Sequence, residues 1–185
     1  MCSSDLLFWQ NVRGKWQITD GVYGEEMGLE EFIDDVMTPL VTMRYAGCNL
    51  ACVCDPANAR DSRTAITPTD LLNERGFKAF TAPTNKFKER LTASEILLNR
   101  RDKGSLIISN HITLLIDTLD GGYQYRKLHT VGAGVVFSSQ PIKNKYSHWA
   151  DAFQYGALHI ITGILSDEDL TLARRLASAS FRRGK

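Results

Sequence analysis

The order of apolar and polar positions along the chain predicts strands at the start, followed by alternating strands and helices. Aromatic and β-branched residues in 7–10 and 16–23 flank a short polar link, a pattern typical of a β-hairpin. Apolar residues then recur at helical spacing from Leu29 to Leu40, with acidic residues on the other side. Pro39 is expected to end or kink this helix, because proline lacks the N–H that a helix interior requires.

The rest of the chain repeats this alternation. Strands are expected at about 48–55, 77–82, 106–108 and 123–128, and helices from a Thr67 cap to Gly76 and over about 87–98, 111–119, 147–165 and 166–181. The helix at 111–119 is expected to have Ser109 or Asn110 as its cap, and the helix from 147 to have Ser147. Strands that pair locally and then alternate with helices predict an α/β fold, a mixed sheet flanked by helices.

Composition describes one globular domain: 185 residues, 43% hydrophobic and 23% charged. The formal net charge of +1 gives no overall attraction to nucleic acid, so such contacts would have to come from local patches. No apolar run approaches the ~20 residues that span a bilayer, so no membrane partner is expected. The spacing of Cys48, Cys52 and Cys54 does not match a zinc site, and we interpret them as buried, reduced thiols.

The first six residues differ in character from the rest of the chain. They show no hydrophobic periodicity, and we interpret residues 1–6 as a non-native leader outside the fold. Residues 7–185 are then the folded domain.

Two carboxylates have positions that suit metal binding. Asp55 directly follows an apolar strand, and Pro56 favours an extended conformation that presents the carboxylate at a sheet edge. Asp-Pro is also an ordinary turn signal. Asp151 follows the expected cap by four residues and shares a helix face with His148 and Tyr155. It could equally be a favourable partner of the helix dipole.

Basic residues precede Asp151 along the chain. Lys143 and Lys145 would ordinarily be solvated, but beside an acid they could contact phosphates. His148 is open to two interpretations, a hydrogen-bonded surface residue or a member of the site.

Four segments together resemble one family. Residues 143–155, with Lys-Asn-Lys-Tyr-Ser-His followed by Asp151, resemble the C-terminal signature of phage terminase large subunits. Residues 55–60 resemble the Asp-Pro-Ala-x-x-Arg segment of that family. Thr84-Asn85 followed by Arg90, and the Gly-Gly-Tyr-x-Tyr run at 121–125, are similar to its intervening elements. The match extends over about residues 7 to 160, in the family's order.

The resemblance implies a ribonuclease H-like nuclease domain that cuts concatemeric double-stranded DNA during viral genome packaging. It implies a site in which three acids hold two divalent cations, Mg²⁺ or Mn²⁺. Asp55 matches the second acid of the family and Asp151 the third. Near the DNA we place Arg60, Lys143, Lys145 and His148. The implied partners are double-stranded DNA, the portal and the terminase small subunit, in the cytoplasm of the bacterial host.

The chain departs from the family at its first acid. That acid lies on a Gly-x-Asp-x-Gly strand ahead of the segment matching residues 7–10, and Asp5 lacks both the glycines and the strand. The domain is therefore expected to lack its first, central strand, which would leave open edges at residues 6–10 and 48–54. We accordingly expect the 185 residues alone to be inactive and the cleavage to belong to a longer parent protein.

Two alternatives remain. The chain could be an inactive fragment that only binds DNA or the portal. It could also be another ribonuclease H-like nuclease, of the resolvase or transposase type.

Overall fold

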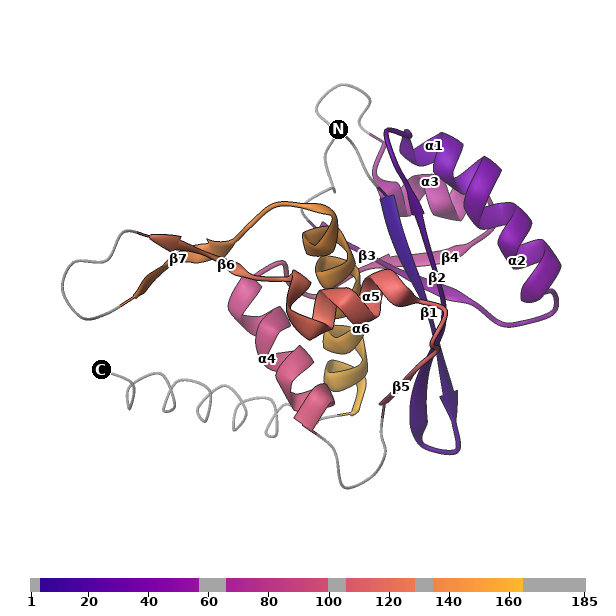
Figure 1. Cartoon of the computed structure of the whole chain (residues 1–185). Coiled ribbons are helices and arrows are strands. Elements are labelled where there is room, and N and C mark those ends of the chain that lie inside the picture. Colours follow the sequence, from indigo (N-terminus) through magenta and orange to yellow (C-terminus); the bar gives the residue numbers. More distant parts are fainter. Residues whose placement is uncertain (1–3, 57–65, 100–105, 129–134, 165–185) are drawn as a thin grey trace.

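The computed structural model describes residues 4–56, 66–99, 106–128 and 135–164 (Figure 1). Strands β1 (Ser4–Val12) and β2 (Lys15–Gly24) form the predicted antiparallel hairpin. Arg13 and Gly14 make its two-residue turn with φ of 53° and 82°, the left-handed values that such a turn requires at both positions. Strand β5 (Leu106–Ile108) adds to β2 in parallel, which completes a mixed sheet in the order β1-β2-β5.

Strand β1 is longer than the sequence pattern predicts. It begins at Ser4, and Ser4, Asp5 and Leu6 pair with Gly24, Tyr23 and Val22 of β2. The exclusion of residues 4–6 from the fold, and the expectation that Asp5 lies outside any strand, are therefore wrong. Alternation was not visible over these residues because Ser4 and Asp5 are poor strand formers, and the pairing with β2 overrides that local preference.

The helix expected at 29–40 consists of α1 (Leu29–Glu31), the π-helical segment η1 (Phe32–Met37) and α2 (Thr38–Arg44). Pro39 does not end it, because the helix continues to Arg44. Before Pro39, the Thr38 N–H bonds to the Ile33 carbonyl five residues back. We attribute the tolerance of proline to this wider turn, which relieves the clash that a ring makes with the carbonyl four residues earlier.

A second, parallel pair of strands comprises β3 (Ala51–Cys54) and β4 (Lys78–Thr81), connected through α3 (Pro68–Glu74). The predicted Thr67 cap is confirmed: its hydroxyl accepts from the Asp70 N–H at 3.1 Å, and the Asp70 carboxylate accepts from the Thr67 N–H at 3.2 Å. The helix ends before Gly76, whose φ is 84°. A small core joins α3 to η1 through Phe32, Ile33, Met37, Leu71 and Leu72.

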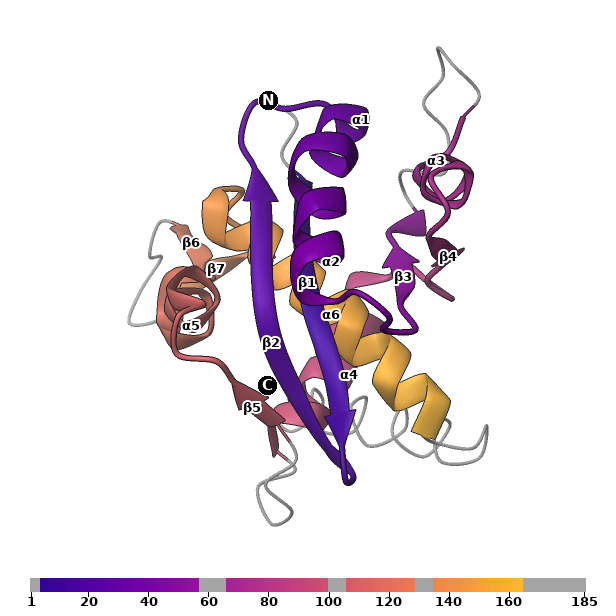
Figure 2. The same cartoon turned by 90° about the vertical axis from the view of Figure 1, so that its right-hand side faces the viewer.

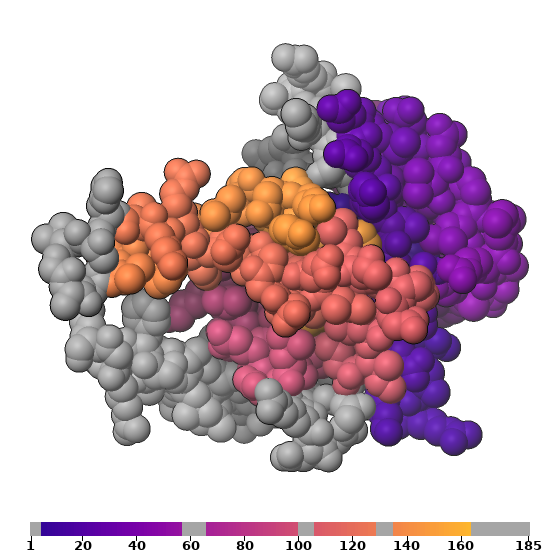
Figure 3. All heavy atoms as spheres, in the orientation of Figure 1, coloured from indigo at the N-terminus to yellow at the C-terminus, as the bar shows by residue number. Residues whose placement is uncertain are grey.

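The remaining elements are α4 (Phe87–Asn99), α5 (Thr113–Asp117), η4 (Thr118–Gly122), β6 (Tyr125–Leu128), β7 (Val136–Pro141) and α6 (Lys145–Ile164). The cap position before α5 is Ile112, with no side-chain cap bond, so neither Ser109 nor Asn110 caps it. The antiparallel β6–β7 hairpin projects from the body, at the left of Figures 1 and 3. Strand β7 was not predicted.

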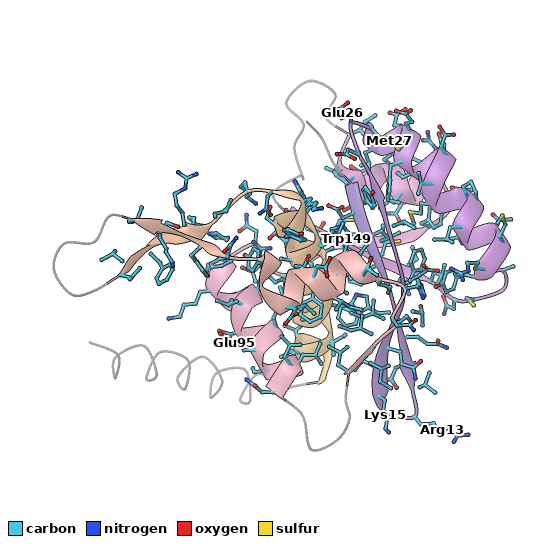
Figure 4. The ribbon with its side chains drawn as sticks, viewed as in Figure 1. Arg13, Lys15, Glu26, Met27, Glu95 and Trp149 are labelled. Carbon is cyan, nitrogen blue, oxygen red and sulfur yellow. The ribbon has the colours of Figure 1, made fainter. Side chains whose placement is uncertain are left out.

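Helix α6 is the centre of the larger core. Phe153 and Ile161 are about 1% exposed and pack in the same cluster as Ile18, Leu97 and Leu115. Gly156 lets the helix approach β1 closely, because a Cβ there would lie 2.6 Å from the Trp9 ring. Trp149, labelled in Figure 4, lies between α6 and the β1–β2 hairpin, against Gly21. Figure 2 shows α6 running behind this hairpin.

Strands β1 and β3, which contain most of segments 6–10 and 48–54, both lie at the edge of a sheet. Among the described strands, β1 pairs only with β2, and β3 pairs only with β4. No described strand therefore joins the sheet that contains β1 to the pair that contains β3. Helix α6 packs against both β1 and β3, so it holds the two sheets together without a strand pair between them.

The thiols of Cys48, Cys52 and Cys54 are free, as interpreted from the sequence. The expectation of burial is wrong for Cys48, which is exposed, and Cys52 and Cys54 are partly buried. Burial raises the pKa of Cys52 to about 11, with a smaller contribution from Cys54, so the thiol stays protonated. No helix in the described part of the chain is long and apolar enough to cross a bilayer. The helix expected at 166–181 lies outside the described residues.

Candidate functional site

The start of α6 is fixed by Asn144 and Ser147. The Asn144 side-chain oxygen accepts from the Ser147 N–H, and the Ser147 hydroxyl accepts from the Asn144 N–H, both at 3.1 Å. Asn144 is therefore the cap, and the prediction that Ser147 caps the helix is wrong by three residues. Asp151 lies farther from the helix N-terminus than predicted, so the helix dipole explains less of its position.

Both oxygens of the Asp151 carboxylate are bound to cations. Arg90 Nη1, from α4, donates to Oδ1 at 2.6 Å, and Lys143 Nζ donates to Oδ2 at 3.3 Å. The Arg90 side chain is 11% exposed, whereas that of Lys143 is 74% exposed. One cation is thus built into the core and the other lies at the surface.

Asp55 is contacted by Tyr155, which lies one turn after Asp151 on α6. The Tyr155 hydroxyl donates to Asp55 Oδ1 at 2.5 Å. The Arg90 guanidinium lies over the Tyr155 ring, 4.6 Å from its centroid. Burial raises the pKa of the Tyr155 hydroxyl, and its hydrogen bond to Asp55 raises it further. Asp55 and Asp151 are therefore linked through Tyr155 and Arg90, and both carboxylates face that pair.

A third carboxylate, Asp5, comes from β1. Its side chain is 8% exposed, and Oδ2 lies 3.7 Å from His148 Nδ1. Burial, and secondly the nearby charge of Asp151, raise the pKa of Asp5 to about 7. His148, Asp151 and Tyr155 form one stripe along α6. This stripe contacts Asp5 through His148 and Asp55 through Tyr155.

The donor chemistry of these side chains fits a divalent cation. Three carboxylates supply the oxygen ligands that Mg²⁺ and Mn²⁺ prefer. Burial raises the pKa of Asp5, and the charge of Asp151 raises it further. As they stand, no three His, Cys, Asp or Glu side chains within the described ranges are gathered closely enough to hold one ion. Arg90 and Lys143 occupy both oxygens of Asp151, so an ion bound there would have to share or displace one of these cations.

The residues placed near DNA by resemblance have different surroundings. Lys143 is bound to Asp151, and His148 faces Asp5. Lys145 Nζ lies 5.1 Å from the Tyr146 ring centroid. Arg60 lies outside the described residues.

The sequence pattern does not identify two members of the site, Asp5 and Arg90, or a second polar cluster elsewhere in the fold. The only sequence signal for Arg90 was its place in the Thr-Asn…Arg element. The second cluster surrounds buried Asp20 on β2, which pairs with Arg44 and has His111 Nε2 at 3.4 Å. It joins the end of α2 and the segment before α5 to β2, and we assign it a structural role.

No known family model matches the sequence, and no curated protein matches it. Among solved structures, the chain is similar to the large terminase from a thermophilic bacteriophage, with a TM-score of 0.59 and 14% sequence identity. The similarity covers 86% of this chain, which spans 37% of that protein. The chain therefore has a terminase-like mixed α/β fold.

Proposed function

We propose that this chain is a ribonuclease H-like nuclease domain of a phage large terminase, which cuts double-stranded DNA with divalent cations. The observation that carries the proposal is the convergence of Asp5, Asp55 and Asp151 from three different elements. They reach one stripe of α6 from β1, from the end of β3 and from α6 itself. The terminase fold of the similar structure supports the same function.

Each residue has a separate task in this proposal. Asp55, Asp151 and Asp5 hold Mg²⁺ or Mn²⁺, and Asp5 supplies the acid that the sequence resemblance lacked. Bound ions of this kind activate a water molecule and stabilise the leaving oxygen of a phosphodiester. Tyr155 orients Asp55, and Arg90 orients Asp151 from within the core.

The DNA contacts follow from charge at the surface beside this site. Lys143 and Lys145 are proposed to meet the phosphate backbone, together with His148 and Arg60. By the same resemblance we propose the portal and the terminase small subunit as partners, and the host cytoplasm as the place of action.

A second candidate is a module that binds DNA or the portal without cutting. The occupation of both Asp151 oxygens by Arg90 and Lys143 favours it, because an ion pair already compensates the charge that an ion would meet. Mg²⁺ loses its hydration water reluctantly, so a site that must first open would bind it weakly.

Nicking of supercoiled plasmid separates the two candidates. The sequence alone predicts an inactive chain because its first acid is missing. With Asp5 proposed as that acid, we instead expect the 185-residue chain to convert the plasmid to nicked and linear forms in Mg²⁺ or Mn²⁺, and to stop when EDTA chelates the ions. Gel shift of the same DNA reports binding independently. A chain that shifts DNA and leaves it intact in both ions would support the binding module instead.

A further inference from the structure

Asp151 holds two cations that differ in how readily they can leave. Arg90 is buried, bonds Oδ1 at 2.6 Å and rests on the rings of Tyr155 and Phe87, with its guanidinium 4.6 Å and 5.9 Å from their centroids. Removing its carboxylate would leave a buried charge unpaired, which is strongly unfavourable. Lys143 bonds Oδ2 at the longer distance of 3.3 Å and is mostly exposed.

Exposed lysine–carboxylate pairs contribute little stability, because both groups are well hydrated when apart. Of the two Asp151 oxygens, Oδ2 can therefore be released at low cost and Oδ1 cannot. An incoming divalent cation would displace Lys143 and leave Arg90 in place. Lys143 directly precedes the Asn144 cap of α6, so its freed ammonium stays beside the site.

We propose that Lys143 is a displaceable internal cation that occupies the metal-binding oxygen of Asp151 until a divalent ion and a DNA phosphate replace it together. The ion takes Oδ2, and the freed ammonium pairs with a phosphate of the backbone. A phosphate that binds Lys143 likewise frees Oδ2 for the ion. Metal and DNA therefore bind with positive cooperativity, and the coupling must be equal in both directions.

This inference rests on the proposed metal site and adds a regulatory role that the site alone does not require. Its physical basis is an exchange of ion-pair partners: one carboxylate oxygen passes from an ammonium to a metal ion, and the ammonium passes to a phosphate. The effect is to favour loading of metal where DNA is already present.

The test is Mn²⁺ binding by electron paramagnetic resonance, with and without a short phosphorothioate duplex that resists hydrolysis. Without DNA, Lys143→Met is expected to bind Mn²⁺ about fivefold or more tightly than wild type, within the usual range of such couplings. The duplex should tighten Mn²⁺ binding to wild type and to Lys143→Arg, and leave Lys143→Met unchanged. Lys15→Met removes the same charge at the exposed turn of the first hairpin, away from α6 (Figure 4), and its Mn²⁺ affinity without DNA should stay close to wild type.

Weaker or unchanged Mn²⁺ binding in Lys143→Met would overturn this proposal while leaving the metal site intact. Equal tightening of Mn²⁺ binding in Lys143→Met and Lys15→Met would also overturn it, since that result is a general effect of net charge. If wild type and Lys143→Met both fail to bind Mn²⁺, the proposed metal site fails and the inference falls with it.

Discussion

Replacing Asp151 by asparagine is expected to reduce Mg²⁺-dependent DNA cleavage by more than about a hundredfold. Losing even an outer partner of a metal ligand can reduce activity about a hundredfold, and Asp151 is proposed as a ligand itself. The amide keeps the shape of the side chain and removes the charge that a divalent ion requires. It also leaves Arg90 facing a neutral group from within the core. The measurement is the initial rate of plasmid nicking, at matched protein and Mg²⁺ concentrations.

The control for this prediction is Asp35→Asn, the same substitution at an exposed carboxylate on η1. It should nick at the wild-type rate. Asp55→Asn should behave like Asp151→Asn, because Asp55 is held towards the same site by Tyr155. Wild-type cleavage by either Asp55→Asn or Asp151→Asn would remove these residues from the catalytic assignment.

Replacing Phe153 by alanine is expected to lower the free energy of unfolding by about 3–5 kcal/mol. Phe153 is 1% exposed, and its ring centroid lies 5.4 Å from that of Trp9 on β1. Truncation would leave a cavity at the contact between α6 and the hairpin. The measurement is urea denaturation followed by circular dichroism.

Phe137→Ala on β7 is the matched control, because Phe137 is 52% exposed. Its free energy of unfolding should stay within about 0.5 kcal/mol of wild type. A loss of similar size in Phe137→Ala and Phe153→Ala would contradict the position of α6 at the centre of the core.

Elements whose signals are local could be predicted from the sequence. The first hairpin rests on a two-residue turn and alternating apolar strands, and the α3 start rests on the Thr67–Asp70 capping box. Both patterns lie within a few residues of the structure they specify. For this reason the mixed α/β architecture could be inferred without any tertiary contact.

The differences at Pro39, where the helix continues instead of ending, and at Asn144 have another cause. At each position two local signals compete, and packing selects between them. A π-helical turn accommodates Pro39, and the Asn144–Ser147 pair moves the cap ahead of the serine. Strand β7 has good strand formers in Val136 and Phe137, but its pairing with β6 depends on a contact that the local pattern does not specify.

The candidate site could be predicted only in part, because its contacts join distant residues. Asp55 and Asp151 were identified from their chemistry and from the resemblance. Their partners could not be, since Arg90 and Asp151 are 61 positions apart and Asp55 and Tyr155 are 100 apart. Asp5 joins them because β1 pairs with β2 as far as Ser4.

The most direct test of the convergence of Asp5, Asp55 and Asp151 is a calorimetric titration of Mn²⁺ into the wild-type chain and the variants Asp5→Asn, Asp55→Asn and Asp151→Asn. If the three carboxylates share a divalent ion, wild type binds Mn²⁺ and each variant binds it at least about tenfold more weakly, by about 1.4 kcal/mol. Failure of the wild-type chain to bind Mn²⁺ would contradict the shared site. The test concentration is about 1 mM, because weak protein sites for such cations have dissociation constants up to about that value. Three variants that bind Mn²⁺ as tightly as wild type would contradict it equally.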